Sequence, residues 1–136
     1  MGIHVSWDEE DIIWLDFVGK WTWLDYRYAS DDIIKMVKTV RHRVYIIADM
    51  RRAAPAPKDS DNQTVRDSLE MAPANHGLVI FLGADRFTQM IIGIMQKFIP
   101  IVHRKIKMAQ TLEEAQAIVF QERDRHGWPQ AAAGDR

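Results

Sequence analysis

The sequence predicts an α/β protein with one mixed, mostly parallel sheet of about five strands, an N-terminal β-hairpin and about four helices. After the hairpin, short apolar runs of strand length alternate with longer segments of helical periodicity. Such alternation is typical of crossover units, in which parallel strands form a sheet and helices cover it. The runs 44–49 and 78–83 are almost continuously apolar, which indicates central strands that are covered on both faces.

Composition limits the class of protein. The chain has 136 residues, no cysteine and a net charge of −1. We expect one domain over residues 1–127 and a flexible C-terminal tail over 128–136. The lack of cysteine excludes disulfides and thiol chemistry. The balanced charge gives no reason to expect nucleic-acid binding, and no apolar run reaches the roughly 20 residues of a membrane span. With no signal-peptide pattern at its start, the chain is expected to be cytoplasmic.

Alternation of apolar and polar residues predicts the hairpin. Ile3, Val5 and Trp7 alternate with polar neighbours, and a second alternating run covers residues 12–18. Two such runs around a short polar turn indicate two antiparallel strands. The turn, residues 8–11, consists of four acidic residues. We expect these carboxylates to face solvent, as runs of charge usually do.

Capping residues and proline place the first two helices. Thr22 is a favourable N-cap for a long amphipathic helix, which we expect to end near the cations 41–43. The apolar strand that follows leads into "AAPAP" at 53–57, where the prolines exclude a continuous helix. A second helix can then begin at Asp59 or Ser60.

The last two helices have clear start signals. Asp85 can cap a third helix, which Pro100 is expected to end. A short strand is predicted within residues 104–109. Thr111 and Glu114 have the spacing of a capping box and mark the start of the final helix.

The sequence carries none of the signatures that would indicate catalysis. It has no glycine-rich dinucleotide or phosphate loop and no nucleophile elbow. No histidine lies three or four residues from another, so a metal pair on one helix is excluded. We therefore expect a protein that is not an enzyme and holds no cofactor or metal.

The junctions at the ends of the two central strands are the main candidate for a binding site. If these strands are parallel, the residues that follow them converge on one edge of the sheet, beside a helix N-terminus. Arginines and exposed N–H groups at such an edge can hold an anion. The alternative is a solvated cluster in which the carboxylates pair with the arginines. We call this edge the strand-end rim; its candidate residues are Asp49, Met50, Arg51, Arg52, Asp85 and Arg86.

The helix over 86–99 carries more large apolar residues than one narrow stripe requires. One face can enter the core while another remains as a patch for association. We select Met90, Ile94 and Met95 as candidate interface residues. The alternative is a central helix that is covered on all sides.

The element order, "VYIIADMR" after a long helix, and a terminal strand followed by "TLEEAQAI" together resemble the STAS fold of bacterial anti-sigma-factor antagonists, over residues 3–125. The resemblance extends to divergent bacterial proteins grouped with STAS and Sec14-like lipid-binding domains. In the antagonists, a phosphorylatable Ser or Thr and a glycine follow an acidic residue at the end of the strand that matches Tyr45–Asp49. Here Asp49 matches the acidic residue, but Met50, Arg51 and Arg52 replace the others. The resemblance thus implies a bacterial regulatory domain that lacks the phosphorylation switch.

Two functions follow from these observations. The first is a non-catalytic regulatory or protein-interaction module, whose partner is another protein or a second copy of the chain. The alternative is a protein that binds a small lipid or anion at Asp49–Arg52 and Asp85–Arg86. In that case an apolar pocket between Trp23, Phe87 and Ile91 would hold the tail of the ligand.

Overall fold

A five-stranded sheet with strand order β1-β2-β3-β4-β5 forms the centre of the computed structural model, which describes residues 2–59 and 61–129. β1 and β2 form an antiparallel hairpin, and the other neighbouring pairs are parallel. The mixed α/β fold and the parallel pairing of the two central strands are therefore confirmed. The strands are β1 (Gly2–Glu9), β2 (Ile12–Gly19), β3 (Val44–Ala53), β4 (His76–Leu82) and β5 (Ile106–Ala109).

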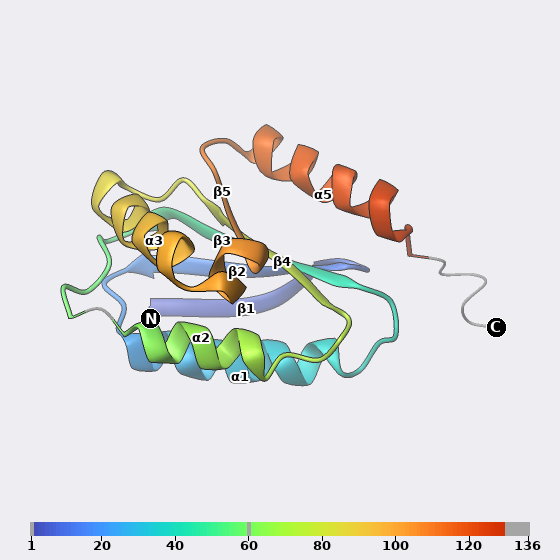
Figure 1. The fold of residues 1–136 in the computed structure, drawn as a ribbon, viewed down its shortest axis with the longest axis horizontal. Helices are drawn as coiled ribbons and strands as arrows, with labels where there is room; N and C mark the ends of the chain where they lie inside the picture. The colour runs from blue at the N-terminus through green and yellow to red at the C-terminus, as the bar shows by residue number, and fades with distance from the viewer. Residues whose placement is uncertain (1, 60, 130–136) are drawn as a thin grey trace.

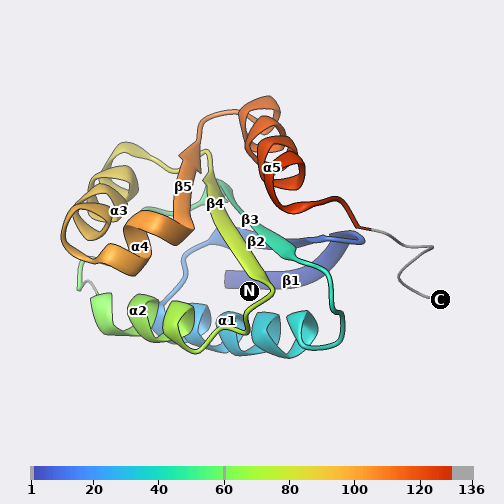
Figure 2. The same ribbon diagram turned by 45° about the vertical axis from the view of Figure 1, so that its right-hand side comes forward.

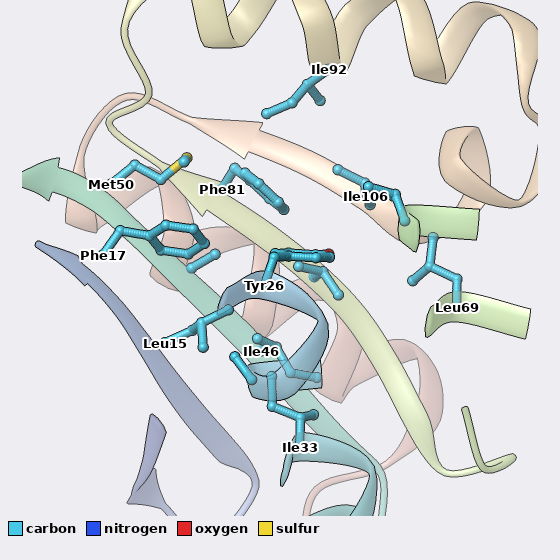
Figure 3. Packing of buried hydrophobic residues seen from close by; sticks show 14 of the residues in the cluster. Leu15, Phe17, Tyr26, Ile33, Ile46, Met50, Leu69, Phe81, Ile92 and Ile106 are labelled. Carbon is cyan, nitrogen blue, oxygen red and sulfur yellow. The ribbon is translucent and has the colours of Figure 1, made fainter. Parts of the chain in front are cut away.

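Helices cover both faces of the sheet, but unequally (Figures 1 and 2). Four helices contribute to the core on one face, and α5 alone packs on the other. The larger core contains Phe17, Tyr26, Ile46 and Phe81, as Figure 3 shows. Each such large side chain stabilises the fold by about 1.5–3 kcal/mol when fully buried. The helices are α1 (Trp23–Val37), α2 (Asn62–Glu70), α3 (Arg86–Phe98), α4 (Pro100–Lys105) and α5 (Leu112–His126).

The two-residue period of a strand decides which face each side chain of β3 reaches. Ile46 and Met50 enter the core beneath α1 and α3, whereas Tyr45 and Ile47 enter the core beneath α5. Asp49 follows Ile47 by two residues and therefore lies on the α5 face of the sheet. Within the strand-end rim, Asp49 therefore lies on the side opposite to the larger core, whereas Met50 enters that core.

The predicted helix caps are confirmed. Thr22 and Asp25 form a capping box at the start of α1, and Thr111 and Glu114 form another at the start of α5. The Asp85 carboxylate accepts a hydrogen bond from the Thr88 amide at 2.8 Å and so caps α3. Each of these caps typically contributes about 1 kcal/mol to stability.

Two predicted helix boundaries differ from the structure. α1 ends at Val37, before the cations 41–43, and α2 begins at Asn62 with Asp61 as its N-cap. The expected start at Asp59 or Ser60 is therefore too early; Ser60 itself lies outside the described residues. The Asp61 side chain prevails because its Oδ1 accepts a hydrogen bond from the Thr64 amide at 3.0 Å.

Pro100 does not terminate the helical region. α3 ends at Phe98, and Pro100 is the first residue of the short helix α4, which gives five helices in the described residues. Proline is favourable at this position because the first turn of a helix needs no amide donor. The observed strand β5 is shorter than the predicted strand over 104–109, because Arg104 and Lys105 belong to α4.

The expectation that all acidic residues of the hairpin turn face solvent is wrong for Asp11. Its side chain is only 2% exposed and receives hydrogen bonds from Arg123 Nε at 2.8 Å and Nη2 at 2.6 Å. Glu9 adds a bond to Arg123 Nη2 at 3.1 Å. α5 packs across the start of β2 and β3, so it carries a buried arginine to the turn.

Trp128, the first residue of the predicted tail, contacts α5. The Trp128 ring lies over the Arg123 guanidinium, with its centroid 4.7 Å from Cζ, and 5.2 Å from the ring of Phe120. Trp128 Nε1 also donates to Asp124 Oδ1 at 3.1 Å. The remaining residues of the predicted tail, 130–136, lie outside the described residues.

Candidate functional site

The strand-end rim is an ion-paired cluster. The backbone amide and Nε of Arg51 donate to Asp49 Oδ1 at 3.0 and 2.9 Å, and Arg51 Nη2 donates to Asp49 Oδ2 at 2.9 Å. Arg52 Nη2 donates to Asp16 Oδ2 at 2.5 Å. Two carboxylates therefore neutralise the two guanidinium groups at this edge. Asp16, which the sequence analysis did not select, reaches the rim because β2 pairs with β3 at Asp49.

The hydrogen bonds and charge of Arg51 stabilise the ionised form of Asp49. Burial alone raises the pKa of Asp49, but the hydrogen bonds and charge of Arg51 outweigh it and leave this pKa below its ordinary value. Asp49 is therefore ionised at neutral pH and satisfies Arg51. Gly83, at the end of β4, has a φ of +69°, and a Cβ there would come within 2.5 Å of Arg51 Cγ. Glycine thus leaves space for Arg51 across the strand end.

The other predicted rim residues, Met50, Asp85 and Arg86, do not join these ion pairs. Met50 points into the larger core and is 4% exposed. The Asp85 carboxylate is engaged in capping α3, and the side chain of Arg86 is exposed at the start of that helix. Arg51 and Arg52 thus have the geometry of the salt-bridge alternative, because each pairs with a carboxylate.

α3 presents a row of exposed apolar side chains, which we call the α3 apolar face: Phe87, Met90, Ile94 and Phe98. Their spacings of three or four residues place them on one side of the helix. The exposed fractions rise to 54% for Met90 and 70% for Phe98. Two of the predicted interface residues, Met90 and Ile94, belong to this face. Met95 lies in the core instead, with 3% exposure.

An apolar cavity lies beneath α3, but it is small. Trp23 and Ile91 contribute to its lining, together with Met50 and Phe81, but Phe87, the third predicted residue, does not and is exposed. Its volume of about 20 Å³ holds one water molecule and no lipid tail. Met50 places this cavity on the face of the sheet opposite to the Asp49–Arg51 pair, so the tail and head group of one ligand would not meet there.

A larger groove, which the sequence analysis missed, lies at the other end of the parallel strands. It has a volume of about 320 Å³ and runs between the C-terminal ends of α4 and α5 over the starts of β4 and β5. We call it the cationic groove; its basic side chains are Arg43, Arg104, Lys105, Lys107, Arg125 and His126. The sequence does contain a signal for this groove, because residues 86–112, which supply three of its cations, contain no aspartate or glutamate.

Comparison with known proteins identifies no relative of this chain. Protein-family models give no match to the chain, and curated proteins give no significant match. Within residues 2–59 and 61–129, no three metal-binding side chains converge on one point. Over the same part of the chain, every helix falls short of the length and hydrophobicity needed to cross a membrane.

Proposed function

We propose that this chain is a non-catalytic protein-interaction module of STAS-like fold, and that it docks its partner on the α3 apolar face. The exposure of four large apolar side chains on one helix carries this proposal. Contiguous apolar surface of this kind marks interaction sites in soluble proteins. The order of strands and helices supports the STAS resemblance.

Charges around the face indicate the chemistry of the partner. Arg86 and Lys97 are exposed at opposite ends of α3, and the helix contains no carboxylate. Antiparallel pairing of two α3 helices around a twofold axis would place Arg86 of one copy near Lys97 of the other. Like charges would then meet, so a second copy is disfavoured. The face instead suits a protein whose apolar residues are flanked by aspartate or glutamate.

The position of Met50 supports a module without a phosphorylation switch. In the antagonists that this chain resembles, the residue after the acidic strand end carries the phosphate. Met50 occupies that position here and is buried. Regulation by modification at this point would require a different, exposed side chain.

A photo-crosslinking amino acid at Met90 tests the docking face. In native cells we expect an adduct with one protein, and no adduct from the same group at Gln121, which is exposed on α5. The captured protein is then purified and titrated against the unlabelled chain. Ile94→Glu should weaken binding at least tenfold, because buried apolar anchors dominate interface energetics.

Matched controls separate the outcomes. Gln121→Glu adds the same charge on another helix and should leave the affinity unchanged. Affinity should also fall as salt rises, because the partner is acidic. A dimer in sedimentation that Ile94→Glu dissociates would contradict the acidic partner in favour of a second copy. Equal affinity for the Ile94→Glu and wild-type chains would contradict the docking face itself.

A further inference from the structure

The cationic groove gathers basic side chains from three separate segments of the chain, near residues 43, 104–107 and 125–126. Arg43 precedes β3, Arg104 and Lys105 end α4, Lys107 lies in β5, and Arg125 ends α5. In Figure 2, α4 and α5 lie on either side of the neighbouring strands β4 and β5. The tertiary fold therefore brings together cations that are far apart in the sequence.

The carboxylates of the groove do not balance these cations. Glu122 is the one acidic residue among its lining residues, and it already pairs with Arg125 at 3.2 Å and His126 at 3.6 Å. Arg43, Arg104, Lys105 and Lys107 have no salt bridge to any carboxylate within the described residues. Four cations thus converge without an acidic partner.

Helix ends account for only part of this charge. The C-termini of α4 and α5 each carry the equivalent of about half a negative charge, which attracts cations. Together with Glu122 they offset about two of the five arginines and lysines that line the groove. A surplus of about three positive charges remains, which is more than the stability of the helices requires.

The environment of Lys105 disfavours its charged form. Lys105 is partly buried, and its Nζ donates to the backbone oxygen of His76 at 2.7 Å. Burial, followed by the charges of Arg43 and Arg104, lowers the pKa of Lys105. A bound anion would reverse this effect by favouring the charged amine.

Tyr45 does not line the groove, but its ring packs behind the lining residue Gly77. The ring of Tyr45 packs so closely on Gly77, which lines the groove, that a Cβ at Gly77 would lie 2.8 Å from it. The hydroxyl of Tyr45 is buried and has no hydrogen-bond partner within the described residues. Buried hydroxyls are normally satisfied, by protein groups or by an ordered water or ligand.

We propose that the cationic groove binds a small molecule with one or two phosphate groups. Its volume of about 320 Å³ lies at the lower end of the range for small-molecule sites, about 300–1,000 Å³. Arginine forks bind phosphate oxygens in pairs, and lysine adds point charge. A pyrophosphate group matches the surplus charge. The groove is separate from the α3 apolar face, so this site stands independently of the docking function.

Isothermal titration of the full chain with inorganic pyrophosphate tests the site. At low salt we expect saturable binding of one pyrophosphate per chain, with weaker binding of inorganic phosphate. The double variant Arg43→Gln/Lys107→Gln should lose at least tenfold in affinity, because two of the unpaired cations are removed. Thermal melts of each variant establish that it is folded before titration.

The control is Arg52→Gln, which removes an exposed arginine at the opposite end of the sheet. It should bind pyrophosphate like the wild type. Equal losses in Arg52→Gln and in the double variant would overturn the assignment to the groove. Citrate that binds as tightly as pyrophosphate would overturn the phosphate specificity. A DNA duplex that binds more tightly than pyrophosphate would overturn the small-molecule assignment in favour of nucleic acid.

Discussion

The two ends of the parallel strands handle charge in opposite ways. At the strand-end rim, Arg51 pairs with Asp49 and Arg52 pairs with Asp16, so each guanidinium has its own carboxylate. At the cationic groove, cations from three segments surround one carboxylate, which pairs only with Arg125 and His126. The rim conforms to the usual location of ligand sites in open α/β sheets, yet the two arginines of β3 there already have carboxylate partners. The comparison shows why the proposed anion site is inferred from unpaired charge and not from position in the fold.

The largest expected difference between the two ends concerns their ion pairs. The Asp11–Arg123 pair lies at the groove end and is buried, whereas the Arg52–Asp16 pair is more accessible, with 65% of the Arg52 side chain exposed. Arg123→Met leaves the Asp11 carboxylate buried without a partner and should lower the free energy of unfolding by about 3–5 kcal/mol. Arg52→Met should lower it by no more than about 1 kcal/mol. Urea unfolding measures both.

A double variant sharpens this contrast. Asp11→Asn/Arg123→Met removes the orphaned charge as well as the guanidinium, so it should recover part of the stability that Arg123→Met loses. Similar unfolding free energies for Arg123→Met and Arg52→Met would show that the ends do not differ in this respect.

A smaller effect is expected from pH, and the two ends should respond in different ranges. Burial and the nearby charge of Lys105 lower the pKa of His76 from 6.5 to about 4. The unfolded chain therefore binds this proton first as the pH falls. The stability that neutral His76 contributes is fully present above about pH 6.5. As the pH falls towards 4, the free energy of unfolding decreases by about 3 kcal/mol.

The contribution of Asp49 at the rim should persist to a lower pH than that of His76. The pKa of Asp49 is lowered below 3.8, so its contribution is present above that value and disappears only as the pH falls through the lowered pKa. Unfolding free energies measured from pH 7 to pH 4 should fall in the wild type and remain flatter in His76→Gln. An equally steep fall in that variant would assign the acid sensitivity to another group.

The smallest predicted effect is also the most diagnostic, because its sign differs between the two ends. Lys107→Gln relieves repulsion among the groove cations and should raise the unfolding free energy by about 0.2–0.5 kcal/mol at low salt. Arg52→Gln removes an ion pair and should lower that free energy by a similar amount. Both changes should shrink at high salt, since ionic screening weakens each interaction. Losses of stability in both variants would contradict an excess of cations in the groove.

Local sequence patterns were sufficient to predict most of the fold. The apolar runs at 44–49 and 78–83 do lie side by side and parallel, and Thr22, Asp85 and Thr111 do cap helices. These features depend on residues within a few positions of one another. Pro100 was misinterpreted because proline can either end a helix or begin one, and its local sequence does not distinguish the two.

Features that depend on distant contacts were not predictable. Asp11 and Arg123 are 112 residues apart, so nothing near Asp11 indicated its burial. The net charge of −1 hid the cationic groove, because the balancing carboxylates lie on other surfaces. The surplus of apolar residues on α3 was visible in the sequence, but only the packing shows that Met95 is covered and Met90 is exposed.

An amide proton–nitrogen correlation spectrum recorded during a pyrophosphate titration tests the contrast between the two ends most directly. The account predicts shifts that saturate together and cluster at Gly77, Leu78 and Lys107, while the amides of Arg51 and Gly83 stay unchanged. Shifts centred on Arg51 and Gly83 would place the anion at the strand-end rim and contradict the account, as would a spectrum that pyrophosphate leaves unaltered.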